Sequence, residues 1–147
     1  MNRGIPIIRR FEGCKLRAYL CPANKWTIGW GSCFYENGSA VKQGDVITQE
    51  RADRLLLSTV AQFEFGVVNS VKSSINANQL GALTSFAFNV GIGNFQRSTL
   101  RRMVIANPNN KFIREEFLKW NKVSGKVLDG LTRRRQAESD LYFTPIQ

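Results

Sequence analysis

The sequence contains no histidine and only three cysteines, and these shortages exclude whole classes of function. Without histidine, Ser-His-Asp and Cys-His nucleophilic catalysis are excluded, as are zinc sites built on histidine. We therefore predict no metal site and no cofactor. Hydrolysis of a glycosidic bond stays open, because it needs only a protonating acid and a group that activates or replaces water.

The odd number of cysteines argues against a disulfide framework and fits synthesis in a reducing compartment. Cys14 and Cys33 are read as small buried residues. Cys14 nevertheless stands seven residues before Cys21, so the two could pair once oxidised and mask Cys21. A Cys14→Ser variant that responds to oxidant as the parent does would exclude this hypothesis.

Long apolar runs are also missing. No stretch approaches the roughly 20 apolar residues that span a bilayer, and the run Ile5 to Ile8 is shorter than the roughly 7–15 apolar residues of a secretory signal. Export, if it happens, therefore depends on something other than such a signal. Its 147 residues suffice for one domain with its own core, residues 1–147.

Positive charge is concentrated in one part of the chain. Of the net charge of +10, most lies in residues 97–135, which hold eleven Lys or Arg and three acids. Such a surface attracts polyanions, so nucleic acid, anionic lipid and acidic cell-wall polymers all fit. A solvated helical face fits equally well.

Apolar periodicity and turn residues predict an α+β fold that is mostly helical. It comprises a small β-containing lobe (1–47), a long connecting helix (48–73) whose weakest point is Gly66, and a helical lobe (74–147), with a cleft between the lobes. The predicted strands cover residues 16–20, 26–31 and 32–35. The predicted helices cover residues 5–12, 48–71, 80–90, 98–106, 110–121 and 131–142.

The most informative pattern is the spacing E-x8-C-x5-T formed by Glu12, Cys21 and Thr27. It places a carboxylic acid, a thiol and a hydroxyl within sixteen residues, as a small glycan-cleaving site would need. Glu12 lies between Phe11 and Gly13 at a helix end, where an apolar neighbour favours the protonated form that a general acid requires. Read singly, each residue also fits an ordinary structural role: surface charge, buried thiol and strand residue.

Several segments together resemble one family. They are Phe11-Glu12-Gly13, Ala18 to Cys21, Trp26 to Gly31, Ile47 to Ala52, Gln79 to Gly91 and Trp120 to Glu138. In this order they are similar to the phage-type lysozymes, the endolysins of glycoside hydrolase family 24. The resemblance implies a lysozyme-like fold and a muramidase that hydrolyses the β-1,4 bond between N-acetylmuramic acid and N-acetylglucosamine in peptidoglycan.

The resemblance also implies roles for single residues. Glu12 would be the general acid, Cys21 takes the place where many members carry aspartate, and Thr27 would position water on the opposite sugar face. Substrate contacts would come from two groups of residues. Two glycines inside a predicted strand suggest that another backbone or a ligand comes close there. Of three consecutive arginines, the resemblance suggests that at least one faces the cleft and steadies Glu12 or the substrate. These residues are Gly29, Gly31, Arg133, Arg134 and Arg135.

Cys21 leaves the stereochemistry open. A thiol with an ordinary pKa is mostly protonated at neutral pH, so either the pKa of Cys21 is lowered, or Thr27 and Glu12 do more of the work, or the thiolate attacks the sugar. Direct attack gives retention, whereas water activation gives inversion, and we favour water activation. A second departure from the family is residues 32–35, where relatives often carry a glycine-rich polar turn.

Two other functions remain as alternatives: a lytic transglycosylase, which yields an anhydro sugar, and a basic nucleic-acid-binding module. The resemblance further implies that the protein stays in the cytoplasm of a host bacterium until it is released to act on the cell wall or periplasm. The expected partners are peptidoglycan, an anionic cell-envelope surface and a holin whose membrane lesion permits release. We expect a monomer and no nucleic acid. The basic segment 110–126 could disturb anionic membranes, although packing of its apolar side chains in the core is the preferred reading.

Overall fold

The computed structural model describes residues 1–147, which form two compact units. The helical unit comprises residues 1–7 and 63–147, and the β-containing unit comprises residues 8–62. The division falls within the predicted connecting helix, α2 (Gln49–Val71), which contributes residues to both units.

The β-containing unit is built on an antiparallel pair, β1 (Lys15–Leu20) and β2 (Trp26–Gly29). The chain enters it through α1 (Ile5–Glu12), which ends where the sequence predicted. Its small core centres on Ile28, Val41 and Leu55, and aromatic and aliphatic side chains from β1, β2 and the following loop pack around them. This core holds the turn between β1 and β2 in place.

The third predicted strand, residues 32–35, is wrong. After β2 the chain reverses at once, and the backbones of Ile28 and Ser32 exchange two hydrogen bonds, of 2.8 and 3.0 Å. Gly29 and Gly31 make this reversal possible, because their φ angles of 64° and 104° lie in a region that other residues rarely adopt. The segment then forms only isolated bridges.

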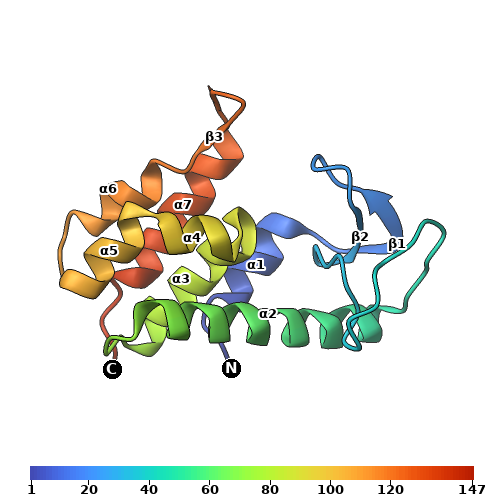
Figure 1. Ribbon diagram of the computed structural model, residues 1–147, viewed down its shortest axis with the longest axis horizontal. Helices are drawn as coiled ribbons and strands as arrows, with labels where there is room; N and C mark the ends of the chain where they lie inside the picture. The colour runs from blue at the N-terminus through green and yellow to red at the C-terminus, as the bar shows by residue number, and fades with distance from the viewer. The chain divides into compact units, whose positions relative to one another are not determined.

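The helices of the helical unit (Figure 1) pack around one apolar core. Its helices are α3 (Ala77–Val90), α4 (Ile92–Arg97), α5 (Thr99–Ala106), α6 (Ile113–Leu118) and α7 (Asp129–Tyr142). Phe86 of α3 lies at the centre, with edge-on contacts to Phe95, Phe117 and Trp120. Helix α3 packs most extensively on α7.

Polar caps explain where α3 and α5 begin. Asn76 and Gln79 form a reciprocal capping box at the start of α3, and Ser98 accepts a hydrogen bond from the Arg101 backbone at the start of α5. The capping box starts α3 three residues before the predicted Leu80. Gly91, with φ of 95°, ends α3 and directly precedes α4, a helix that the sequence reading did not predict.

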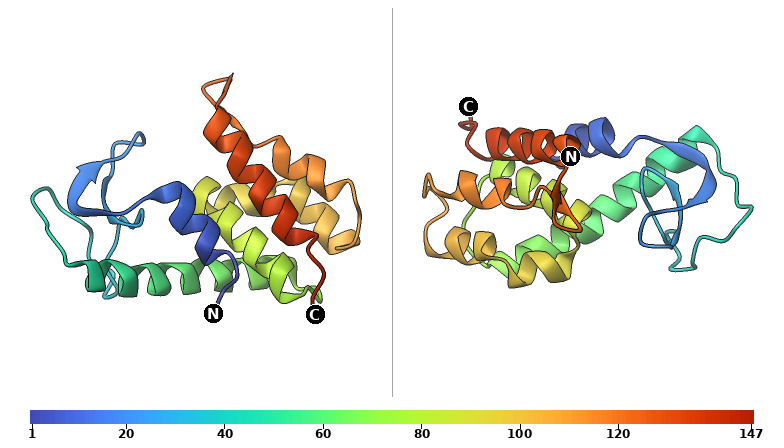
Figure 2. Two further views of the ribbon diagram at one scale, coloured as in Figure 1. Left: turned by 180° about the vertical axis from the view of Figure 1, so that it is seen from behind. Right: turned by 90° about the horizontal axis from the view of Figure 1, so that it is seen from above.

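The predicted helix over residues 110–121 is shorter than expected. It covers only Ile113–Leu118 and is followed by a hairpin of β3 (Lys122–Val123) and β4 (Lys126–Val127), which projects from the helices of this unit (Figures 1 and 2). No continuous basic helix therefore spans residues 110–126. Ile113 and Phe117 are fully buried, as expected for core packing, whereas Phe112 is 59% exposed and does not join the core.

Charge on residues 97–135 is partly compensated within the helical unit. Lys119 pairs with Glu116, Arg114 with Asp140 and Arg133 with Asp129. None of the helices combines the length and the apolar character that crossing a bilayer requires.

Candidate active site

Glu12 is the last residue of α1 and is half-buried. Gly13, which follows it, has a φ of 68° and ends the helix. Because the helix ends here, the Glu12 side chain belongs to a fixed element while the chain turns away into β1. The structure thus places the predicted acid at the entry to the β-containing unit.

Cys21 lies directly after β1, in a tight turn that leads to β2. Its backbone N–H donates to the Lys25 carbonyl at 3.0 Å, and the Asn24 N–H donates to the Cys21 carbonyl at 2.8 Å. The Lys25 backbone has the largest effect on the Cys21 thiol and lowers its pKa. Burial opposes this, and the Thr27 side chain adds a smaller lowering effect, so the pKa is lowered overall. This turn favours the thiolate.

Thr27 lies on β2, opposite Tyr19 of β1, and is only 3% exposed. Its Oγ1 donates to the Lys25 carbonyl at 3.0 Å and also lies 3.7 Å from the Cys33 sulfur. The Thr27 side chain also lowers the pKa of the Cys21 thiol, so the two side chains lie close together. The structure therefore brings two of the three predicted catalytic side chains together.

Tyr19 connects this pair electrostatically to Glu12. Burial is the largest cause that raises the pKa of Tyr19, followed by the charges of Glu12, Cys21 and Cys33. All three groups must lie near the Tyr19 hydroxyl to act in this way. Sequence reasoning gave Tyr19 no role and read Cys33 as a small buried residue, whereas Cys33 is only half-buried.

The two glycines proposed for substrate contact have a structural role in the reversal after β2. Gly29 is buried, and a side chain at this position would contact Ala52 at 3.6 Å. Trp30 is held by its indole N–H, which donates to Asp53 at 2.9 Å. Contacts of Gly29 and Gly31 with substrate remain a prediction.

The three consecutive arginines do not share one environment. Arg133 is exposed beside Asp129, whereas Arg134 and Arg135 are 3% and 0% exposed and pair with the buried Glu138. Arg135 also donates to the Asn89 side chain at 2.9 Å. Sequence reasoning missed Glu138, because a carboxylate on a charged helix gives no sign of burial. A role of these arginines toward Glu12 or substrate remains a prediction.

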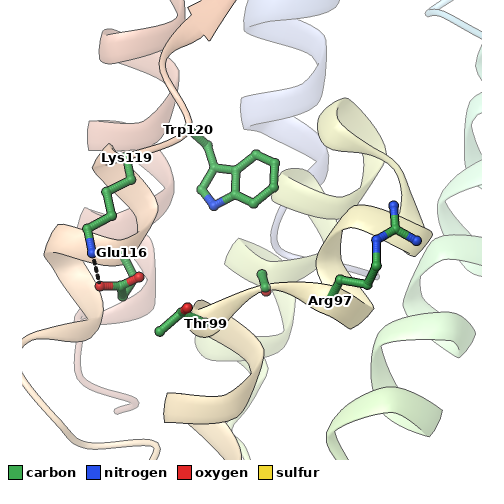
Figure 3. Close-up of a pocket in the computed structure, with 6 residues that line it drawn as sticks. Arg97, Thr99, Glu116, Lys119 and Trp120 are labelled. Atoms are coloured by element: carbon green, nitrogen blue, oxygen red, sulfur yellow. Dashed lines mark hydrogen bonds and ion pairs between the residues drawn. The ribbon is translucent and has the colours of Figure 1, made fainter.

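A pocket of about 420 Å³ opens on the helical unit. Figure 3 shows the Trp120 indole between Arg97 and the Lys119–Glu116 ion pair, whose charged atoms lie 2.7 Å apart. The lining residues are Arg97, Ser98, Thr99, Glu116, Lys119 and Trp120. An aromatic face beside two cations suits a ligand with both a carbon skeleton and negative charge. Sequence reasoning did not single out this group.

No cluster of three or more metal-ligating side chains is present anywhere in the structure.

This fold and this arrangement match a known family. The family model described as phage lysozyme matches residues 9–138, a range that contains Glu12, Cys21 and Thr27. The chain belongs to the phage lysozyme family. The α+β, mostly helical and lysozyme-like fold expected from the sequence is confirmed by solved structures of the family.

Relatives among phage proteins share much of the sequence. The chain is 42% identical to the endolysin of Bacillus phage B103 over 143 residues, which are 96% of this chain and 52% of that protein. It is 38% identical over 145 residues to the endolysin of Acyrthosiphon pisum secondary endosymbiont phage 1, covering 96% of this chain and 95% of that one. The chain thus spans about half the length of the first relative and nearly all of the second.

Two solved structures are similar over almost their whole length. A mutant of P22 lysozyme gives a TM-score of 0.81 at 33% identity, covering 98% of this chain and 97% of that one. The muramidase domain of SpmX from Asticaccaulis excentricus gives a TM-score of 0.85 at 32% identity, covering 99% and 97%.

Proposed function

We propose that this member of the phage lysozyme family is an endolysin that hydrolyses the β-1,4 bond between N-acetylmuramic acid and N-acetylglucosamine in bacterial peptidoglycan. The observation that carries the proposal is that Glu12, Cys21 and Thr27 lie in one unit and within the range that the family model matches, with the Thr27 side chain acting on the pKa of the Cys21 thiol. The names of the relatives, endolysin and muramidase domain, support it.

Glu12 acts as the general acid. Its proton passes to the glycosidic oxygen as the bond between that oxygen and the anomeric carbon breaks, so that the leaving sugar departs as a neutral alcohol. The anomeric carbon becomes electron-poor, and a water oxygen completes the product. The rate depends on a carboxyl group at this position because glutamine, its isostere, has no acidic proton to give.

Cys21 and Thr27 act on the water. The lowered pKa of Cys21 increases the share of thiolate at neutral pH, and a thiolate can take a proton from water as water attacks the sugar. Thr27 is buried and holds its oxygen beside the thiol, where it can orient that water. This route inverts the anomeric centre, whereas attack by the sulfur itself would retain it.

The pocket around Trp120 gives the same enzyme a second contact with its substrate. Peptidoglycan carries acidic peptide stems, and the exposed ammonium of Lys119 and the guanidinium of Arg97 can pair with their carboxylates while the indole packs on the carbon skeleton. A stem carboxylate bound in this pocket would compete with the Glu116 carboxylate for the Lys119 ammonium.

Three partner and location assignments complete the proposal. The enzyme acts as a monomer, reaches the wall through a membrane lesion made by a holin, and is drawn to an anionic cell-envelope surface by its positive charge. Of the alternative functions, a nucleic-acid-binding module gains no support, because two of the basic residues in segment 97–135 are buried with Glu138.

The test is the identity of the sugar ends released from purified peptidoglycan. After borohydride reduction, hydrolysis by this enzyme gives muramitol from new reducing N-acetylmuramic acid ends. Reducing N-acetylglucosamine ends would show cleavage of the other glycosidic bond, and 1,6-anhydro ends would show a lytic transglycosylase. Either result contradicts the proposal, and the anomer formed first, read by NMR, then distinguishes inversion from retention.

A further inference from the structure

The Thr27 hydroxyl has more hydrogen-bonding neighbours than it has protons. It donates to the Lys25 carbonyl at 3.0 Å and lies 3.7 Å from the Cys33 sulfur, and it also lowers the pKa of the nearby Cys21 thiol. A hydroxyl carries one proton and two lone pairs. Since Thr27 is only 3% exposed, bulk water has little access to its hydroxyl, and the two lone pairs depend mainly on neighbouring protein groups for hydrogen bonds.

The direction of the bond to Cys33 follows from this count. While the Thr27 proton points to the Lys25 carbonyl, the contact with Cys33 is a hydrogen bond only if the Cys33 S–H donates to the Thr27 oxygen. From this geometry we propose that Cys33 is a positioning residue, which holds the Thr27 hydroxyl where it can hydrogen bond to Cys21 during the reaction. The inference rests on the proposed function and adds a residue to the water-handling side of its site.

The role of Cys33 is largest when Cys21 loses its proton. The Thr27 proton can then turn from the Lys25 carbonyl to the new thiolate, because a charged acceptor makes the stronger bond. The Cys33 S–H continues to donate to the same oxygen, so the chain of donors runs from Cys33 through Thr27 to Cys21. Such a chain stabilises the anion more than Thr27 would alone.

The other charged and titratable groups around this chain come from separate elements. Glu12 lies on α1 and Tyr19 on β1, and the charges of Glu12, Cys21 and Cys33 all act on the Tyr19 hydroxyl. Lys25 contributes through its backbone, since its carbonyl is the acceptor in this turn. Of these residues only Cys33 changes in the variants proposed below, and Glu12, Tyr19, Cys21 and Lys25 stay as they are.

The backbone at Cys33 is fixed independently of its side chain. Its carbonyl accepts from the Val41 N–H at 3.0 Å, and Ser32 before it is tied to Ile28 by two backbone hydrogen bonds. Cys33 itself is only half-buried. Removing the sulfur therefore leaves the segment in place, so substitution tests the hydrogen bond rather than the fold.

The experiment compares Cys33→Ser with Cys33→Ala and Cys33→Val, all in a Cys14→Ser background. Serine keeps a donor, whereas alanine and valine remove it. The readouts are the pH dependence of Cys21 alkylation by iodoacetamide, followed by mass spectrometry, and the kcat and KM of peptidoglycan cleavage. Trypsin separates the two thiols of the reference protein, because Cys21 lies in peptide 18–25 and Cys33 in peptide 26–42.

We expect Cys33→Ala and Cys33→Val to shift alkylation of Cys21 to higher pH and to lower kcat about threefold at unchanged KM, as loss of one weak hydrogen bond would. Cys33→Ser should match the reference. If the alanine and valine variants, folded by circular dichroism, show the Cys21 profile and kcat of the serine variant, Cys33 has no positioning role. The alkylation readout needs no peptidoglycan, so it fails or succeeds separately from the proposed activity.

Discussion

Arg135 Nε lies 2.8 Å from Glu138 Oε1, and both side chains are fully buried in the helical unit. The same carboxylate accepts from the Ser85 hydroxyl at 2.6 Å and from Arg134 Nε at 3.2 Å. Charges removed from water are tolerated only when partners and hydrogen bonds replace it. This network therefore fixes the relation between α3, which carries Ser85, and α7.

Replacing Glu138 should destabilise the protein strongly. Glu138→Gln keeps the shape but leaves two buried guanidinium groups without this carboxylate, and we expect a loss of about 3–5 kcal/mol in the free energy of unfolding. Urea denaturation measures it. Asp129→Asn on the same helix is the control, because the exposed Arg133–Asp129 pair should contribute less than about 1 kcal/mol. Equal effects of the two substitutions would contradict the network's role.

Tyr35 should make stability depend on alkaline pH. Burial, followed by its hydrogen bond to Asp45 at 2.7 Å, raises the pKa of Tyr35 from 10.0 to about 12. A raised pKa in the folded state means that the stabilisation is complete below pH 10 and is lost as the pH rises through about 12. The Tm difference between the parent and Tyr35→Phe should accordingly shrink over that range. A Tm difference that stays constant from pH 8 to pH 12 would be inconsistent with a stabilising hydrogen bond between Tyr35 and Asp45.

Gly66 in α2 should resist substitution for a packing reason. A Cβ at this position would lie 2.9 Å from Ile92 Cδ1 and 3.0 Å from Ile92 Cγ1. Alanine gains about 1 kcal/mol in helix propensity, but overpacking costs about 1–3 kcal/mol, so we expect Gly66→Ala to destabilise by about 1 kcal/mol.

The control for Gly66 is a double-mutant cycle. Ile92→Val removes the nearest atom, so in that background Gly66→Ala should become neutral or stabilising in thermal unfolding. If Gly66→Ala is stabilising on its own, the packing of Ile92 of α4 against α2 does not require glycine at position 66. Gly66 is then simply the weak point of the helix that the sequence indicated.

The predictable parts of the fold are those specified by short-range patterns. Asn76 and Ser98 cap α3 and α5 as their residue types indicate, although the capping box of Asn76 starts α3 earlier than expected. The strand predicted at residues 32–35 failed because Gly29 and Gly31 reverse the chain there, so that the segment pairs only in isolated bridges. Helix α4 was missed because the glycines around it were read only as helix ends.

The site was predictable to a similar extent. The spacing of Glu12, Cys21 and Thr27 could be read from the sequence, and the effect of Thr27 on the pKa of Cys21 follows from the β1–β2 turn. The burial of Arg134 and Arg135 could not be read, because it depends on Glu138 one turn later and on Ser85 in a distant helix. Tertiary pairing of this kind leaves no local signal.

Cys21→Asp should lower the pH below which activity is lost, called here the acid limit of activity. Parent activity falls as the Cys21 thiolate is protonated, and the pKa of this thiol is lowered from 9.0 by the Lys25 backbone and Thr27. Aspartate ionises near pH 4, so the variant should stay active at lower pH than the parent. The pH profile of kcat/KM measures this, with Cys21→Ser as the variant that cannot ionise. If all three share one acid limit, Cys21 is not the base.

The most direct measurement is the rate at which parent and Glu12→Gln release reducing ends from purified peptidoglycan, with both proteins matched for Tm and circular dichroism. Loss of a general acid typically costs a factor of about 10²–10⁴, so the account predicts at least a hundredfold decrease in kcat. A folded Glu12→Gln variant within a few-fold of the parent would contradict it.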